Sequence, residues 1–126
     1  MSDSINTYAL VKSSPRSVFL FNNRSDGTGE TNVQKIDISD LPGAPTKIKI
    51  NKIIWSVSGM AVQIMFDHTA NDTAIILTGE GELNLCGLGG IVDPASAGGT
   101  GDILFSTLNA DADDGYSIIL EVEEAP

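Results

Sequence analysis

The feature that most constrains this chain is an alternation of apolar and polar residues in short segments separated by glycine-containing turns. Residues 60–67 and 116–123 show it most clearly. Their apolar positions are Met60, Val62, Ile64 and Phe66 in the first segment and Tyr116, Ile118, Leu120 and Val122 in the second. A period of two places successive side chains on opposite faces of a strand. No segment keeps apolar residues at helical spacing for three turns, so the pattern predicts a protein built from β-strands.

Residues 46–57 alternate in two different phases. The first phase holds Ile48 and Ile50, and the second holds Ile53, Trp55 and Val57. A shift of one residue moves every following side chain to the other face of a sheet, so the change near Asn51 and Lys52 predicts a β-bulge or a strand that changes sheets. We expect further strands at 17–22, 32–38, 73–78, 82–86 and 102–107.

Turn residues separate these segments and define the fold class. Ser58 and Gly59 lie between two predicted strands and predict a tight hairpin, and residues 78–81 predict another turn. About eight strands at this spacing predict an all-β fold, a single antiparallel β-sandwich of the jelly-roll or immunoglobulin-like type. Residues 1–15 are polar and are expected to form a flexible N-terminal arm, with the sandwich domain over residues 16–126.

Charge is distributed unevenly along the chain. The formal net charge is −10, and all seven Lys and Arg residues lie within residues 1–66. Five of the seventeen acidic residues also lie there, which leaves twelve acidic residues in 67–126. Such a chain lacks the basic face that binds nucleic acid or anionic lipid, so we expect neither as a partner. The carboxylates of the second half form a solvated surface, dock on a basic partner or meet a cation.

Little in the sequence indicates catalysis. A nucleophile–base pair would need Cys86 and His68, the only residues of their types. We interpret His68 as a polar turn residue and Cys86 as a small buried hydrophobic residue. Residues 109–115 alternate oxygen ligands as calcium loops do, but they lack the required Gly and Glu and are interpreted as an acidic hairpin tip. A zinc site is not expected either, for want of Cys and His ligands. We predict no enzymatic activity, no cofactor and no metal site.

The remaining features are typical of a binding or structural module. A lone cysteine excludes a disulfide scaffold, and the N-terminus has no signal-peptide pattern, so synthesis in a reducing cytoplasm is expected. No apolar run is long enough to span a membrane. Residues 16–21 are apolar on both faces and form either a buried strand or a strand docked on a partner. The partner contacts are placed in the arm and in this strand, at Tyr8, Leu10, Phe19 and Phe21.

The order and spacing of several turns carry a resemblance that spans about residues 25–122. The matching positions are residues 25–30, 43–47 with Ile53, 58–60 before Phe66 and Asp67, Gly90 with Asp93 and Pro94, 100–103, and Gly115 with Tyr116. In these positions the chain resembles a family of small virion proteins of tailed bacteriophages that are common in marine phages. Where such relatives carry a neutral hairpin before the last strand, this chain is acidic at residues 109–113.

The resemblance implies a non-enzymatic structural role in the virion, after synthesis in the host cytoplasm. The first expectation is a capsid decoration (cement) protein that binds the exterior of the major capsid protein shell as a small homo-oligomer. A small tail, neck or fibre-base protein is the second. A calcium- or glycan-binding module on the virion and a small hydrolase remain as alternatives.

Overall fold

Eight antiparallel strands form most of the chain, which is described by a computed structural model over residues 4–13, 16–43, 45–94 and 97–125. The strands are β1 (Ser4–Lys12), β2 (Arg16–Asp26), β3 (Val33–Ile36), β4 (Ile48–Phe66), β5 (Asp72–Asn84), β6 (Ile91–Val92), β7 (Ile103–Leu108) and β8 (Ala112–Glu124). Two short 3-10 helices, η1 (Ile38–Asp40) and η2 (Cys86–Leu88), lie in the connections. The predicted all-β class is confirmed.

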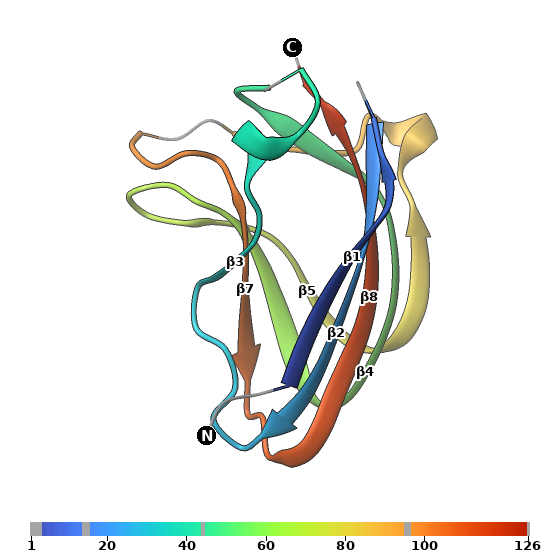
Figure 1. Cartoon of the computed structure of the whole chain (residues 1–126), viewed down its shortest axis with the longest axis vertical. Coiled ribbons are helices and arrows are strands. Elements are labelled where there is room, and N and C mark those ends of the chain that lie inside the picture. The colour runs from blue at the N-terminus through green and yellow to red at the C-terminus, as the bar shows by residue number, and fades with distance from the viewer. Residues whose placement is uncertain (1–3, 14–15, 44, 95–96, 126) are drawn as a thin grey trace.

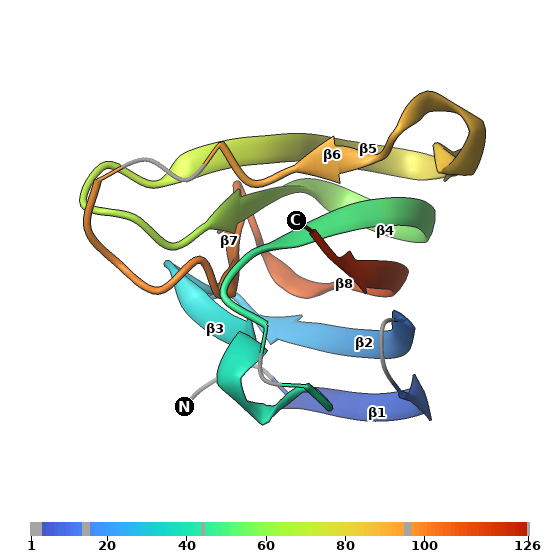
Figure 2. The same ribbon diagram turned by 90° about the horizontal axis from the view of Figure 1, so that it is seen from above.

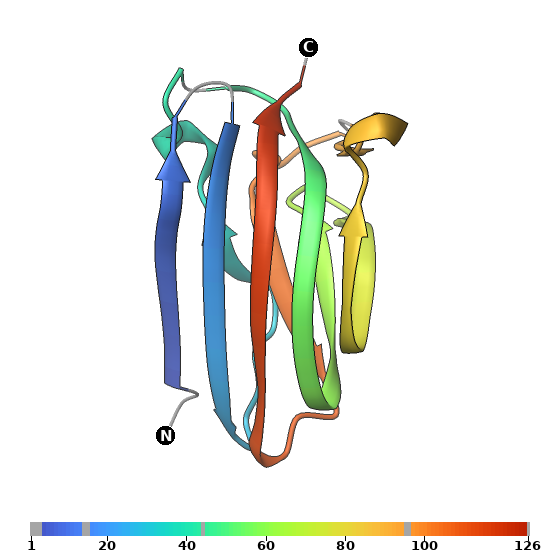
Figure 3. The ribbon, with the colours of Figure 1, turned by 90° about the vertical axis from the view of Figure 1, so that its right-hand side faces the viewer.

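The strands form two layers (Figure 1). The first layer has the order β1-β2-β8-β4-β5 and uses residues 48–58 of β4 and 79–84 of β5. These strands lie side by side in Figure 3 and are seen from above in Figure 2. The second layer has the order β5-β4-β7-β3 and uses residues 61–66 of β4 and 72–77 of β5. Since β4 and β5 continue from one layer into the other, the sandwich is closed like a barrel along that side.

This crossing corrects two predicted turns. Ser58 and Gly59 do not form a hairpin but lie inside β4, where the pairing with β5 shifts between Val57 and Val62. Gly79 likewise lies inside β5. Both glycines have positive φ, +79° at Gly59 and +63° at Gly79, which lets each strand bend sharply without ending.

The core lies between the layers and follows the predicted alternation. The apolar residues of the two segments that alternate most clearly are all buried, as are Ile48, Ile50, Ile53 and Val57 of β4. The change of phase is confirmed as a bulge, because the pairing of β4 with β8 shifts between Ile50 and Lys52. Aromatic rings fill the centre, where Phe105 packs edge-to-face against Phe21 at 5.1 Å and against Tyr116 at 5.8 Å between ring centroids.

One buried polar network interrupts this apolar core. The Glu30 carboxylate accepts hydrogen bonds from Tyr116 and Asn23 and pairs with Lys35. Both charged side chains are almost completely buried, at 3% exposure for Lys35 and 4% for Glu30. A buried ion pair of this kind is tolerated because the carboxylate also receives hydrogen bonds. The network links the loop after β2 to β3 and β8.

The flexible arm expected over residues 1–15 is corrected for residues 4–12, which form the edge strand β1. It pairs with β2 from Ser4–Arg24 to Lys12–Ser17, with a bulge between Ala9 and Val11. Residues 1–3 and 14–15 lie outside the described residues. Pairing with β2 explains the difference, because an edge strand gains backbone hydrogen bonds even when its side chains stay in solvent.

Candidate interaction surface

The outer face of the first layer carries an apolar row across four strands. The row consists of Tyr8 on β1, Leu20 on β2, Ile119 on β8 and Ile54 on β4. Leu20 pairs directly with Tyr8 and with Ile119, and Ile119 pairs with Ile54. Leu20, Ile54 and Ile119 are half-buried, and Tyr8 is 53% exposed. We call these four residues the outer row.

Two shallow hollows lie along the outer row. The first is lined by Leu20, Ile54, Ile119, Trp55 and the acidic side chains of Glu80 and Glu82. The second is lined by Val18, Ile54 and Ile119, together with Arg16, Lys52, Cys86 and Glu121. An apolar strip with a charged rim is the usual anatomy of a protein–protein interface.

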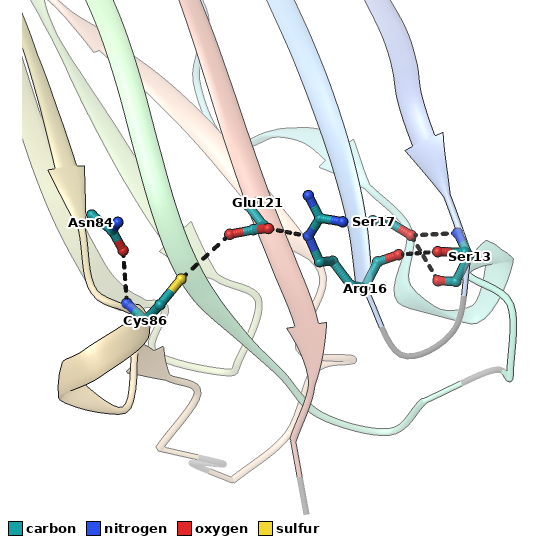
Figure 4. Close-up of polar contacts among 6 residues, drawn as sticks. All are labelled: Ser13, Arg16, Ser17, Asn84, Cys86 and Glu121. Atoms are coloured by element: carbon teal, nitrogen blue, oxygen red, sulfur yellow. Dashed lines mark hydrogen bonds and ion pairs between the residues drawn. The ribbon is translucent and has the colours of Figure 1, made fainter.

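Polar contacts frame one side of this surface (Figure 4). Glu121 of β8 pairs with Arg16 of β2 through one carboxylate oxygen. Its other oxygen lies 3.7 Å from the thiol of Cys86. Cys86 is exposed, so its interpretation as a buried hydrophobic residue is wrong. A surface ion pair of this kind adds little to stability.

Two of the four predicted contact residues lie at the surface and two do not. Tyr8 and Leu10 project from β1 and are 53% and 52% exposed. Phe19 and Phe21 are core residues, at 8% and 0% exposure, and are therefore corrected as contacts. The apolar residues of the same strand that face outward are Val18 and Leu20. Because residues 16–21 are apolar in both phases, the sequence did not show which phase faces the core.

Cys86 and His68 have separate partners. Cys86 contacts Glu121 and Asn84 in the first layer. His68, which follows β4, is 8% exposed and contacts Asp93 and Gly98. The structure does not pair the two residues in any contact among those it describes. His68 lies in the loop between β4 and β5, as expected, but its side chain is buried.

The ring of His68 is enclosed by oxygen atoms. Nδ1 lies 2.8 Å from the Gly98 carbonyl oxygen, and Nε2 lies 2.7 Å from Oδ1 of Asp93. A second carboxylate oxygen, Oδ2 of Asp72, lies 3.8 Å from Nε2. Burial by itself lowers the pKa of His68, but the Gly98 hydrogen bond and the two carboxylates outweigh it, so the pKa is raised above its ordinary value.

His68, Asp72 and Asp93 form a group that could hold a metal ion, with ligand atoms within 4.8 Å of one another. Sequence reasoning did not find it. His68 and Asp93 are 25 residues apart and lie in different loops, and no spacing motif connects them. Tertiary hydrogen bonds join the loop after β4 to the loop after β6. The Thr69 backbone N–H donates to the Ala97 carbonyl, and the Gly101 N–H donates to the Asp67 carbonyl.

The acidic segment at 109–115 is arranged differently from the predicted hairpin tip. It connects β7 in the second layer to β8 in the first, and Asp113, Asp114 and Gly115 already belong to β8. The Asp113 carboxylate pairs with Arg24 at 2.9 Å. Oδ2 of Asp114 accepts from the Asp111 backbone N–H at 2.9 Å. Two of its carboxylates are therefore used within the fold.

Comparisons with known proteins identify no family. No family model matches the chain, and no curated protein matches it. Solved structures match over almost the whole chain at low identity. A cupin superfamily protein from Desulfitobacterium hafniense is 15% identical with a TM-score of 0.41, covering 100% of this chain and 82% of its own. The CBM1 of BiXyn10A is 10% identical with a TM-score of 0.49, covering 99% and 93%.

A third solved structure, of infectious bursal disease virus Gt strain, is 14% identical with a TM-score of 0.33. It covers 98% of this chain and 32% of the viral chain. At these identities and TM-scores, the similarities carry no argument about function. Within the described part of the chain, no helix is long and apolar enough to cross a membrane.

Proposed function

We propose that this protein is a structural component of a bacteriophage virion, a decoration protein that binds the exterior of the major capsid protein shell and stabilises it without catalysis. The observation that carries the proposal is the outer row. It presents four apolar side chains on adjacent strands of one sheet, framed by charged residues. Exposed apolar patches of this kind mark protein interaction sites.

The phage assignment is supported by the resemblance of the turn residues. The structure shows what several of these residues do. Glu30 accepts a hydrogen bond from Tyr116, and Asp102 accepts from the Ile38 backbone N–H and from the Gln34 side chain. These residues hold loops to strands inside the fold. A shared pattern at such positions supports a shared scaffold, and the contact surface has to be tested separately.

The proposed mechanism is stabilisation by mass action. A protein that binds the assembled shell but not its dissociated subunits shifts the equilibrium toward the shell. Many identical sites on the lattice allow modest contacts to act together when the decoration protein is a small homo-oligomer. The sandwich suits this role because its outer row lies on one sheet and needs no ordering of a loop on binding.

The decisive experiment compares two matched variants for binding to purified shells of the phage that encodes the chain. Ile119→Glu places a charge at the centre of the outer row. Ile76→Glu makes the same change at an apolar side chain of β5, 53% exposed, in the part of β5 that belongs to the second layer. We expect Ile119→Glu to weaken binding by about tenfold or more, the loss typical of a central interface residue, and Ile76→Glu to leave it within about twofold.

Circular dichroism must show that both variants keep the native fold. Equal binding by the two variants would contradict the placement of the contact surface. Cryo-electron microscopy of intact virions tests the location: density on the head lattice supports decoration, and density confined to the tail or neck contradicts it. Absence of the chain from virions by mass spectrometry would end the virion proposal altogether.

A further inference from the structure

We propose that His68, Asp72 and Asp93 bind one divalent transition-metal ion, such as Zn²⁺, which fastens the loop after β4 to the loop after β6. The three side chains come from three places in the chain. His68 lies after β4, Asp72 begins β5 and Asp93 follows β6. Their ligand atoms lie within 4.8 Å of one another at one end of the sandwich.

The hydrogen bonds of the His68 ring provide the first argument. A carbonyl oxygen can only accept, so Nδ1 must carry the proton that is donated to Gly98 at 2.8 Å. In the neutral ring this leaves a lone pair on Nε2, which faces the Asp93 oxygen at 2.7 Å. Two lone pairs at that distance repel each other. Either a proton on Nε2 or a cation bound between Nε2 and the Asp93 oxygen removes the repulsion. A metal-bound histidine has this arrangement, with the other ring nitrogen donating to a backbone carbonyl.

Asp72 provides the second argument, independent of the ring. Its Oδ2 is buried, and no donor among the described residues forms a hydrogen bond with it. A proton on Nε2 would form a hydrogen bond with Asp93 but not with Asp72, because Asp72 Oδ2 lies 3.8 Å from that nitrogen. A buried carboxylate oxygen without a donor is costly. A cation bound to Nε2 would contact both carboxylates and remove the cost.

Charge balance favours the same conclusion. An imidazolium and two carboxylates sum to −1, whereas a neutral ring, two carboxylates and a divalent cation sum to zero. His68 and Asp93 are nine-tenths buried or more, where uncompensated charge is unfavourable. All three residues belong to the part of the chain from residue 67 onward, which contains no Lys or Arg.

The donor set selects the class of ion. One imidazole nitrogen and two carboxylate oxygens suit Zn²⁺ and related first-row ions, whereas Ca²⁺ and Mg²⁺ take oxygen ligands. Bonds of about 2.0–2.2 Å to a tetrahedral ion require ligand atoms about 3.3–3.6 Å apart. His68 Nε2 and Asp93 Oδ1, now 2.7 Å apart, would therefore separate by about 0.6–0.9 Å. The Asp72 side chain, 27% exposed, has room to approach.

The test is titration of the tag-free protein with Zn²⁺ by calorimetry, alongside Asp72→Asn and Asp111→Asn. Asp72→Asn removes one ligand and leaves the contact between His68 and Asp93 intact, so folding is expected to survive. Asp111→Asn makes the same change in the 109–115 segment and serves as the matched control. We expect one Zn²⁺ per chain, binding weakened by about tenfold or more in Asp72→Asn, and binding within about twofold in Asp111→Asn.

Two further readouts separate a metal site from a buried ion pair. His68 is the only histidine, so its ring nitrogens give a single set of NMR signals, and Zn²⁺ should shift the Nε2 signal while Nδ1 keeps its proton. Saturating Zn²⁺ should raise Tm by about 5–10 °C, reversed by EDTA. Failure to bind Zn²⁺, or equal binding by Asp72→Asn and the unmodified chain, would overturn the site. Neither result bears on shell binding.

Discussion

Strands β1 and β2 are neighbours in one sheet, yet they contribute to the fold in opposite ways. In β2 every second side chain is buried from Ser17 to Ser25. In β1 all residues from 5 to 12 are exposed, including Ile5, Tyr8 and Leu10. β1 is held by backbone pairing with β2, whereas β2 is held by pairing on both sides and by the core.

The difference shows that strand formation and burial are separate properties. Alternation of apolar and polar residues arises when one face of a strand is buried. Residues 5–12 of β1 are all exposed, so β1 shows no such alternation. A strand of this kind adds surface rather than core, and Tyr8 extends the outer row by one strand. The edge that it covers would otherwise expose the backbone groups of β2.

The two strands should differ most in how alanine substitution changes the free energy of unfolding, at the paired positions Phe21 and Thr7. Phe21→Ala should lower the free energy of unfolding by about 3–5 kcal/mol, because the ring is fully buried against Phe19 and Phe105. Thr7→Ala on β1 should change it by less than about 0.5 kcal/mol. Urea denaturation measures both.

Phe21→Leu is the control for the aromatic position, since it keeps most of the buried volume and should recover most of the lost stability. Similar losses for Phe21→Ala and Thr7→Ala would show that β1 takes part in the core, against its exposure.

Deletion of residues 1–12 should have a smaller effect. The shortened chain should still unfold cooperatively, because β1 contributes none of the buried core residues among those that the structure describes. It should bind phage shells more weakly, since the outer row loses Tyr8. Thermal unfolding by circular dichroism and co-sedimentation with shells measure the two effects. Unchanged shell occupancy would show that β1 does not contact the shell. Loss of the folded state would show that β1 is needed for folding.

The smallest expected effect is a change in Tm when the cap of η1, which lies beside these strands, is removed. Lys12 of β1 and Phe19 of β2 share a small hollow with Asp37 and Leu41. The Ser39 hydroxyl and backbone N–H donate to the Asp37 carboxylate and hold its pKa below the usual value. This contribution is present above pH 3.8 and is lost as pH falls through the lowered pKa.

Asp37→Ala should therefore lower Tm slightly at pH 7, and the difference should shrink below pH 3.8. Asp40→Ala, in the same helix but without a cap contact in the structure described, is the control. A Tm difference that stays constant across this pH range would show that the Asp37 carboxylate does not stabilise the cap.

Several elements were predictable from local pattern. Residues 60–66 and 116–122 show which face is buried, and the opposite phases on either side of Asn51 show the bulge. Gly59 and Gly79 could not be interpreted in the same way. A glycine with positive φ fits a turn or a bend, and only pairing between β4 and β5 decides which. Met65, on the phase opposite to the core of its segment, is also buried, which alternation does not predict.

The candidate sites depended even more on the tertiary structure. The sequence by itself determined the all-β class, the strand phases and the separation of charge, because these follow from residue type and period. Only the fold decided that Leu20 and not Phe21 faces solvent, that Tyr8 joins Ile54 in one row, and that His68 meets Asp93. Contacts between residues distant in the chain are fixed by strand register and layer crossing, and no local pattern encodes them.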